Sequence, residues 1–253
     1  MTNHSIVISQ PYYFPWPGLF EQMRLASIFI HYDDVQFSKG HFQDRVQIKT
    51  EKGIKWLTVP KKNLKLGQNI CEVAIDNTKD WKRIQLEFLR QVFKNAPYVK
   101  DMLNLVVNVF DNEFKYLSEL TILSTMAVGD YLNLKKDTLY YKSSDLPVKG
   151  TGTERVLNIV KYFNAACYLT GMGALKYLDF ELFEKHNIKV RFIEYKKKEY
   201  RQLFGFFNPY VSSLDLIANE GKDSFQYICS ESVYWKEFIN SVEAKKYLAG
   251  ESS

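Results

Sequence analysis

Hydrophobic residues near the start of the chain form two short runs separated by a helix-like stretch. Apolar runs of strand length lie at residues 6–9 and 27–32, and residues 19–26 carry apolar side chains at helical spacing. The second run ends at Asp33 and Asp34. Short apolar runs bounded by turn residues are typical of buried strands. Strand, helix and strand in this order predict a βαβ unit, and hence a parallel sheet with a right-handed crossover.

Further strand-like and helix-like segments follow along the chain. Strand-like patterns occupy residues 46–49, 55–59, 69–75, 138–142, 166–170 and 189–194. Helical spacing covers residues 80–94, two stretches within 103–132, then 151–163, 173–178 and 224–247. Thr151 and Glu154 have the spacing of a capping box at the start of one of these helices. We therefore expect residues 1–253 to form a single α/β domain with a Rossmann-like, mainly parallel sheet, a helical insert at 80–135 and a helical tail at 224–253.

Composition and charge narrow the classes of partner. Hydrophobic residues make up 46% of the chain, aromatic residues 15%, and the net charge is +5. Aromatic side chains at this density line pockets as well as cores. The lysines within 61–65 and 196–198 indicate either solvated faces or attraction to a phosphate-bearing ligand. Because the basic residues follow no single stripe, nucleic acid is not an expected partner.

Cysteine spacing and the N-terminal segment indicate a cytoplasmic protein. The three cysteines show neither CxxC nor metal-ligand spacing, which favours reduced thiols and no metal site. The N-terminal segment lacks the basic and apolar regions of a signal peptide. No run of about 20 apolar residues is present, so we expect no membrane span.

Four punctuated loops follow the predicted parallel strands, at residues 10–18, 33–37, 143–153 and 171–177. Ligands of open α/β sheets bind beyond the carboxyl ends of the strands. In the first loop, three prolines stiffen a segment that carries Gln10, Tyr12 and Trp16. A stiff loop holds a ligand at low entropic cost, although a purely structural turn is the alternative.

Candidate acid–base groups end the second predicted strand. Adjacent strand residues point to opposite faces, so either Asp33 or Asp34 is the candidate general base and the other an orienting group. His31 lies on the same face as Asp33. Arg45 can grip a phosphate or carboxylate with two bonds, although a surface ion pair with Asp44 would also account for it. We expect Gln10, Tyr12, Asp33 and Arg45 to surround one cavity.

Ser144 and Thr151 lie in a segment suited to an anion. Backbone N–H groups and hydroxyls at a helix N-terminus attract phosphate. Helix capping explains Thr151 equally well. Neither GKS/T nor GxGxxG is present, so this is not one of the common nucleotide-binding loops.

Taken together, these segments resemble the WbqC-like family. The matching stretches are IVISQPYYFPWPGLFEQM, IFIHYDDVQFSKGHFQDRVQIK, KWLTVP, SSDLPVKGTGTERVLNIVKYFNAACYLTGMGALKYLD and LDLIANEG. The resemblance marks as motif positions Gln10, Pro11, Tyr12, Pro15, Trp16, Gly18, Asp33, Asp34, Gln36, Phe37, Arg45, Trp56, Pro60, Gly171, Tyr177, Asp215 and Gly221. Two positions depart from the family's common pattern, since Ser9 stands in place of a histidine and Asp44 in place of an asparagine. If that histidine is the family's base, this chain needs another, such as His31 or Asp33.

The resemblance implies a role in bacterial O-antigen and related surface-polysaccharide synthesis. The implied activity is that of an acyl or aminoacyl transferase, including a glycyl transferase, acting on a nucleotide-linked amino sugar. The implied donor is an acyl thioester, with an acyl-carrier protein as candidate partner, and no cofactor is firmly implied. Asp33 or His31 would be the base, Arg45 would hold phosphates, Tyr12 and Trp16 would stack on the base or sugar, and Gln10 would orient the acyl carbonyl.

Two other hypotheses remain open at the level of sequence. The first βαβ unit is distantly similar to nucleotidylyltransferase-like folds such as pantothenate synthetase, which suggests ATP-dependent activation of a carboxylate. Those enzymes use paired histidines on the first loop, and this chain has none there. A non-catalytic module of a polysaccharide-synthesis complex is the other hypothesis, and it predicts an exposed aromatic patch without a small-molecule pocket.

Overall fold

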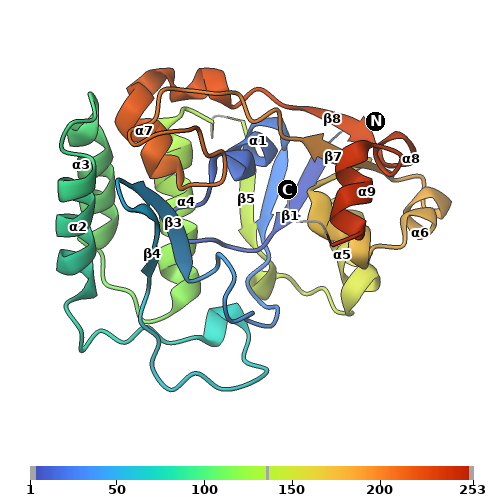
Figure 1. Ribbon diagram of the computed structural model, residues 1–253. Coiled ribbons are helices and arrows are strands. Elements are labelled where there is room, and N and C mark those ends of the chain that lie inside the picture. The colour runs from blue at the N-terminus through green and yellow to red at the C-terminus, as the bar shows by residue number, and fades with distance from the viewer. Residues whose placement is uncertain (1–3, 135–136, 251–253) are drawn as a thin grey trace.

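A six-stranded, mainly parallel sheet with helices on both faces forms the centre of the molecule (Figure 1). The computed structural model describes residues 4–134 and 137–250. The strands of the sheet are β1 (Ser5–Ser9), β2 (Ile28–His31), β5 (Leu139–Lys142), β6 (Cys167–Thr170), β7 (Lys189–Glu194) and β8 (Glu231–Tyr234). Their order is β5-β2-β1-β6-β7-β8, and only β8 runs antiparallel to its neighbour. The predicted α/β class with a Rossmann-like, mainly parallel sheet is confirmed.

Helices and a separate hairpin complete the fold. The α-helices are α1 (Pro17–Leu25), α2 (Trp81–Val92), α3 (Val99–Phe110), α4 (Leu117–Tyr131), α5 (Gly152–Tyr162), α6 (Phe180–Lys185), α7 (Ser213–Glu220), α8 (Trp235–Phe238) and α9 (Val242–Leu248). The 3-10 helices are η1 (Ile70–Glu72), η2 (Ser143–Asp145), η3 (Met172–Lys176) and η4 (Gly221–Tyr227). Strands β3 (Arg45–Thr50) and β4 (Gly53–Thr58) form the predicted hairpin beside α2–α4 (Figure 1). In the part of the chain that the structure describes, no helix is long and apolar enough to cross a membrane.

The two faces of the sheet bury two separate hydrophobic clusters. Side chains of successive strand residues point to opposite faces, so Val7 and Phe29 pack with α1, α3, α4 and α7. Ile6 and Ile30 pack on the other face with α5, α6 and α8. Strands buried on both faces become continuous apolar runs, which is the pattern seen in their sequences.

Four local predictions are wrong, each for a physical reason. Residues 69–75 form η1 and isolated bridges, because they run between two loops rather than beside a strand. The segment starting at residue 173 is a 3-10 turn, η3, before α6 begins. The predicted helical tail contains β8, which pairs with the free edge of β7. The N-cap side chain of Thr151 makes no capping bond.

The helical insert and the tail extend into residues that lie outside the description. Residues 80–134 contain α2, α3 and α4, while residue 135 is not among those described, and the assignment of this range as an insert stays a prediction. Residues 251–253 of the tail likewise lie outside the described residues.

The topology creates a switch point between β1 and β6. The chain leaves β1 through α1 on one face and reaches β2, whereas β5 connects through α5 on the other face to β6. The strand order therefore reverses direction between β1 and β6. In open α/β sheets the loops at this point diverge and leave a crevice for ligands.

Candidate functional site

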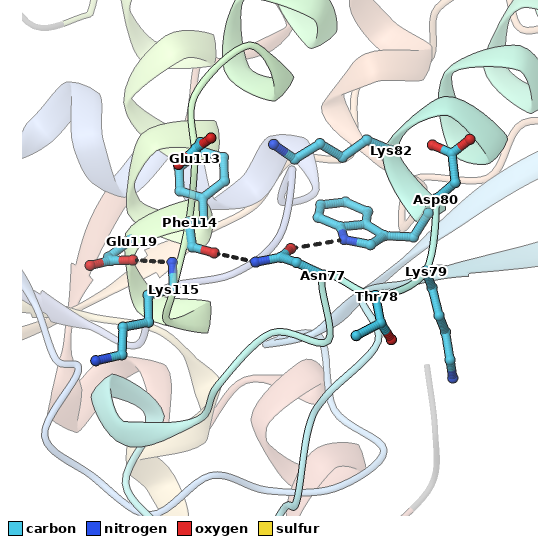
Figure 2. A pocket seen from close by; sticks show the side chains of 10 residues that line it. Asn77, Thr78, Lys79, Asp80, Lys82, Glu113, Phe114, Lys115 and Glu119 are labelled. Carbon is cyan, nitrogen blue, oxygen red and sulfur yellow. Dashed lines mark hydrogen bonds between the residues drawn. The ribbon is translucent and has the colours of Figure 1, made fainter.

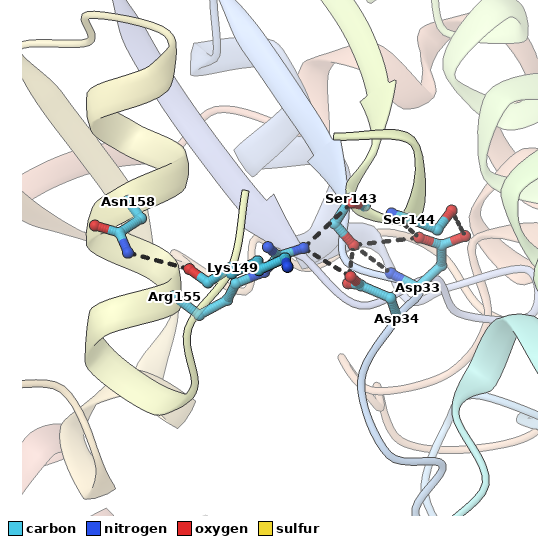
Figure 3. Close-up of polar contacts among 7 residues, drawn as sticks. All are labelled: Asp33, Asp34, Ser143, Ser144, Lys149, Arg155 and Asn158. Carbon is cyan, nitrogen blue, oxygen red and sulfur yellow. Dashed lines mark hydrogen bonds and ion pairs between the residues drawn. The ribbon is translucent and has the colours of Figure 1, made fainter. Parts of the chain in front are cut away.

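The carboxylate of Asp33 joins the carboxyl ends of β2 and β5 (Figure 3). It accepts bonds from the Ser143 hydroxyl at 3.2 Å, the Ser144 backbone N–H at 3.0 Å and the Ser144 hydroxyl at 2.9 Å. Asp33 is buried, with 1% of its surface exposed. A carboxylate held by this many donors is a structural anchor, and its role as a base stays a prediction.

Asp34 follows Asp33 beyond the end of β2, bonds the same Ser143 hydroxyl and pairs with Arg155 (Figure 3). The Arg155 guanidinium lies 2.7 Å from Asp34 Oδ2 and also donates to the Ser143 carbonyl at 3.3 Å. The Asp34 side chain is 25% exposed and that of Arg155 is 8% exposed. The Asp34 end of this ion pair is therefore partly open to solvent, whereas Arg155 is buried.

Glycine at position 150 permits the approach of Arg155. Gly150 has φ +122°, and a Cβ added there would lie 3.1 Å from the backbone nitrogen of Arg155. Asn158 donates to the Lys149 carbonyl at 3.1 Å and fixes the same loop on α5. The loop before α5 thus folds back onto the first turn of the helix and holds Arg155 towards the ends of β2 and β5.

Tyr32 lies beside this ion pair, and Tyr177 lies near both Tyr32 and Tyr12. Asp34 and Arg155 both affect the pKa of Tyr32, which burial raises to about 12. Burial also raises the pKa of Tyr12 to about 12, with Tyr177 the next contributor. Tyr168 lies close enough to Tyr177 for a hydrogen bond. All of these hydroxyls are neutral near pH 7 and can donate hydrogen bonds to sugar or phosphate oxygens.

Gln10 begins the loop after β1 and is held by a buried partner. The Gln43 side-chain nitrogen donates to Gln10 Oε1 at 2.7 Å, and Gln43 Oε1 accepts from the Ser38 backbone at 2.8 Å. No part of Gln43 is exposed. The orientation of the Gln10 amide is thereby fixed, and its amino group remains to serve as a donor at the switch point.

His31 faces the apolar side of the sheet. Its ring lies between Phe29, with centroids 5.1 Å apart, and Tyr140, at 6.2 Å. Burial lowers the pKa of His31 to about 4, and its Nε2 atom has no hydrogen-bond partner. The imidazole is therefore neutral near pH 7, and its role as a base stays a prediction.

Arg45 and Trp16 make their contacts with residues other than Asp33, Asp34 and Arg155. The Arg45 guanidinium stacks over Trp56 at 4.2 Å and donates to the Gly40 carbonyl. Asp44 pairs with Lys61 rather than with Arg45. The Trp16 ring packs edge-on against Tyr195, at 4.9 Å.

Close packing of Trp16 requires glycine two positions later. A Cβ on Gly18 would lie 2.2 Å from the Trp16 ring. The indole consequently folds over the first turn of α1. Packing against Trp16 is therefore sufficient to explain why position 18 is a glycine. The aromatic residues Tyr13 and Phe14 of the same loop are buried in the core.

The remaining predicted residues are distributed along the same loops. Gln36 is exposed and its backbone forms a bridge with Asn69. Gly171 precedes η3, and Tyr177 follows it with about half of its surface exposed. Thr151 is the N-cap residue of α5, and its side chain makes no capping bond. Thr153, two residues later, donates its hydroxyl to the Tyr177 carbonyl at 3.0 Å. The loops after β5 and β6 are thereby tied together.

Sequence reasoning missed Arg155, Tyr32, Tyr168 and Gln43. Strand parity did not assign these faces, because β2 ends at His31 and both Asp33 and Asp34 contact the Ser143 hydroxyl. A partly buried carboxylate such as Asp34 requires a cation nearby. Arg155, in the first turn of α5, provides it. Gln43 gave no local signal, since it lies in an irregular loop.

Two open cavities lie away from the strand ends. One, of about 860 Å³, lies between residues 77–82 and 113–119 (Figure 2), where the Lys82 ammonium lies 5.2 Å from the centre of the Phe114 ring and 6.0 Å from that of the Trp81 ring. The other, of about 530 Å³, lies between α3 and α4. Neither is lined by a predicted site residue. Within residues 4–134 and 137–250, no group of three or more histidine, cysteine or acidic side chains is placed to hold a metal ion.

Fold and edge geometry define a doubly wound α/β protein with polar and aromatic side chains at its topological switch point. Comparison with known families matches residues 10–227 to the WbqC-like protein family, and the chain belongs to this family. The chain is also 31% identical, over 226 residues, to the uncharacterized protein Rv1507c of Mycobacterium tuberculosis (strain ATCC 25618 / H37Rv). That alignment covers 88% of this chain and 96% of the relative. No solved structure matches.

Proposed function

We propose that the protein is an acyl or aminoacyl transferase that modifies the amine of a nucleotide-linked amino sugar. The proposed setting is bacterial O-antigen or related surface-polysaccharide synthesis in the cytoplasm. The observation that carries the proposal is the Arg155–Asp34 pair beside Tyr32, with Tyr177 near both Tyr32 and Tyr12. The ion pair lies at the carboxyl ends of β2 and β5, on the same edge of the sheet as the switch point between β1 and β6, and ligands of such folds bind at that edge.

Each group in this cluster suits one part of such a substrate. Arg155 supplies a fixed guanidinium for a phosphate, while the neutral tyrosine hydroxyls suit sugar hydroxyls and the phosphate oxygens. The Gln10 amide, held by Gln43, is a donor for the acyl carbonyl oxygen as negative charge develops there. Gly171 lies in the neighbouring loop, after β6, and is a further candidate for ligand contact through its backbone.

Asp34 is the carboxylate best placed to accept the amine proton. Asp33 is fully hydrogen-bonded and His31 is enclosed by aromatic rings, whereas Asp34 is partly exposed. In the proposed step, the amine nitrogen attacks the thioester carbonyl carbon and the amine loses a proton to Asp34. The carbon–sulfur bond then breaks, and the leaving thiolate takes that proton back from Asp34 and departs as the thiol.

The test is a binding and turnover experiment with purified full-length protein. Nucleotide sugars with and without an amino group, ATP, and acyl thioesters are first screened by thermal shift, because a ligand at 100 times its Kd stabilises by about 2.7 kcal/mol. Mass spectrometry then follows N-acylation of the best amino-sugar ligand. Tyr12→Phe should weaken binding about tenfold, since one hydrogen bond is lost. Tyr131→Phe, in the cavity between α3 and α4, is the matched control.

The alternatives give different results in the same experiment. Stabilisation by ATP with magnesium, together with carboxylate-dependent release of pyrophosphate, would replace the proposal with the carboxylate-activating hypothesis. The absence of any ligand-induced shift would favour a non-catalytic module.

A further inference from the structure

The last helix of the chain packs against the segment that carries Tyr177. Helix α9, red in Figure 1, contacts η3, and Tyr177 directly follows η3. Ala244 of α9 is completely buried, and the Ser241 hydroxyl caps the helix by accepting a bond from the Ala244 backbone at 3.1 Å. The final helix is therefore docked beside the loop that follows β6.

Tyr247 lies on the buried side of α9. Residues three apart in a helix share a face, so Tyr247 is on the same side of the helix as Ala244. The ammonium of Lys176 in η3 lies 4.5 Å from the centre of the Tyr247 ring, and Tyr247 is partly buried. Lys245 and Lys246, which lie between them in sequence, are exposed. The ring of Tyr247 therefore points towards η3, and the two lysines point to solvent.

Tyr247 belongs to a row of tyrosine hydroxyls that begins at the ion pair of the candidate site. Tyr32 lies beside this ion pair and near Tyr177. Burial, with added contributions from the nearby hydroxyls of Tyr177 and Tyr247, raises the pKa of Tyr12 to about 12. The row therefore runs from the ion pair through Tyr32 and Tyr177, and Tyr247 lies at its other end.

The helix that carries Tyr247 lies beyond the part of the chain that matches the family. The match ends at residue 227, so β8, α8 and α9 follow it, whereas the other hydroxyls of the row lie within it. Aromatic packing holds this added segment in place. The Trp235 ring stacks on Phe180 at 4.9 Å, and the Phe238 ring stacks on Phe192 at 4.4 Å. The segment after the match thus adds a fixed polar group to the edge of the site.

We propose that Tyr247 is a specificity-determining residue of the candidate site and binds the nucleoside of the nucleotide sugar. This inference rests on the proposed function, in which Asp34 receives the amine and Arg155 the phosphate. The nucleoside then extends to the other end of the row, where the Tyr247 hydroxyl bonds a ribose hydroxyl or a polar edge of the base. A hydrogen bond of this kind selects against ligands that lack the bonded group.

Calorimetric titration of the full-length protein tests this assignment. The probes are UDP-, GDP- and dTDP-linked amino sugars and the corresponding free nucleoside diphosphates. Tyr247→Phe keeps the ring over Lys176 and removes only the hydroxyl, so we expect an unchanged melting temperature and about a tenfold loss of affinity. The loss should be the same for a nucleotide sugar and its free nucleoside diphosphate, because both carry the nucleoside. Tyr162→Phe is the matched control, since this half-exposed tyrosine lies at the end of α5 opposite to Arg155 and packs on Phe163.

The outcomes separate this inference from the proposed function on which it rests. If no nucleotide sugar in the panel binds the wild type, both are overturned. If the wild type binds and Tyr12→Phe weakens the binding while Tyr247→Phe does not, only the role of Tyr247 is overturned. A loss confined to the nucleotide sugar, an equal loss in Tyr162→Phe, or a lowered melting temperature in Tyr247→Phe would each overturn that role as well.

Discussion

The guanidinium of Arg155 lies 2.7 Å from the carboxylate of Asp34 and connects α5 to the loop that follows β2. Removing the cation leaves a partly buried carboxylate without its partner. Because Asp34 retains some contact with solvent, we expect Arg155→Met to lower the free energy of unfolding by about 1–3 kcal/mol, less than for a fully buried pair.

A second substitution at this position tests the ligand role of Arg155. Arg155→Lys keeps the charge but cannot bond Asp34 and Ser143 in the same geometry, so nucleotide-sugar affinity should fall about tenfold in calorimetric titration. Arg191→Lys is the control, because Arg191 also bonds a serine, Ser232, but within the β7–β8 pair. Equal affinities for wild type and Arg155→Lys would remove Arg155 from the proposed site.

Substitution of Asp33 separates an anchoring role from a catalytic one. Asp33→Asn retains one acceptor but places an amide nitrogen in a site that contains hydrogen-bond donors. We expect a loss of about 1–3 kcal/mol in chemical unfolding, with Ser144→Ala giving a smaller loss in the same direction. A variant that keeps wild-type stability but loses turnover would instead identify Asp33 as the base.

Glu21 makes the stability of the protein depend on pH. No part of this side chain of α1 is exposed, and burial raises its pKa from 4.5 to about 7. The folded state therefore holds a proton that the unfolded state releases between pH 4.5 and 7, so this contribution to stability is lost as pH rises through 7.

Glu21→Gln should remove that dependence. Relative to wild type, the variant should gain stability as pH rises from 4.5 to 7, approaching roughly 3 kcal/mol at most, since each pKa unit corresponds to about 1.4 kcal/mol. Urea unfolding across this range provides the measurement. Glu87→Gln, at a half-exposed position on α2, should show no such trend. A constant difference between Glu21→Gln and wild type would contradict the prediction.

His31 should have the opposite effect at acidic pH. Burial lowers its pKa from 6.5 to about 4, so the unfolded state binds a proton in this range while the folded state does not. Stability is consequently lost as pH falls from 6.5 towards 4. His31→Phe should lose less stability than wild type over this interval, whereas the exposed His186→Gln should behave as wild type. If catalysis disappears in a folded His31→Phe, the proposal of Asp34 as base is wrong.

Arg45 provides a separate test of the anion-binding hypothesis. The partly exposed stack on Trp56 stabilises the fold only slightly, so Arg45→Ala should cost less than about 1 kcal/mol. If Arg45 holds a phosphate of the ligand, the affinity of the protein for that ligand should nevertheless fall more than tenfold in Arg45→Ala. The fall should be smaller in Arg45→Lys. Arg83→Ala, which removes an exposed pair on α2, is the control. Unchanged affinity in Arg45→Ala would leave Arg45 as a surface residue of the hairpin.

The sequence alone determined the class of fold and the identity of most elements. Buried parallel strands need apolar side chains on both faces, so β1, β2, β6 and β7 appear in the sequence as short apolar runs. Helices α2 and α3 bury one face each, so their apolar residues recur at helical spacing. The positions of the loops after these strands followed directly, and so did the prediction that Gln10, Asp33 and Ser144 belong to loops at one edge of the sheet.

Only the tertiary structure decided which side chains meet at that edge. Asp34 and Arg155 are 121 residues apart, and Gln10 and Gln43 are 33 apart, so no local period relates them. Strand β8 was also hidden, because an edge strand that is buried only in part lacks the continuous apolar run of the central strands. Chain order does not specify the partners of a loop residue, since those partners depend on the strand order 5-2-1-6-7-8 and on which face of the sheet each crossover helix covers.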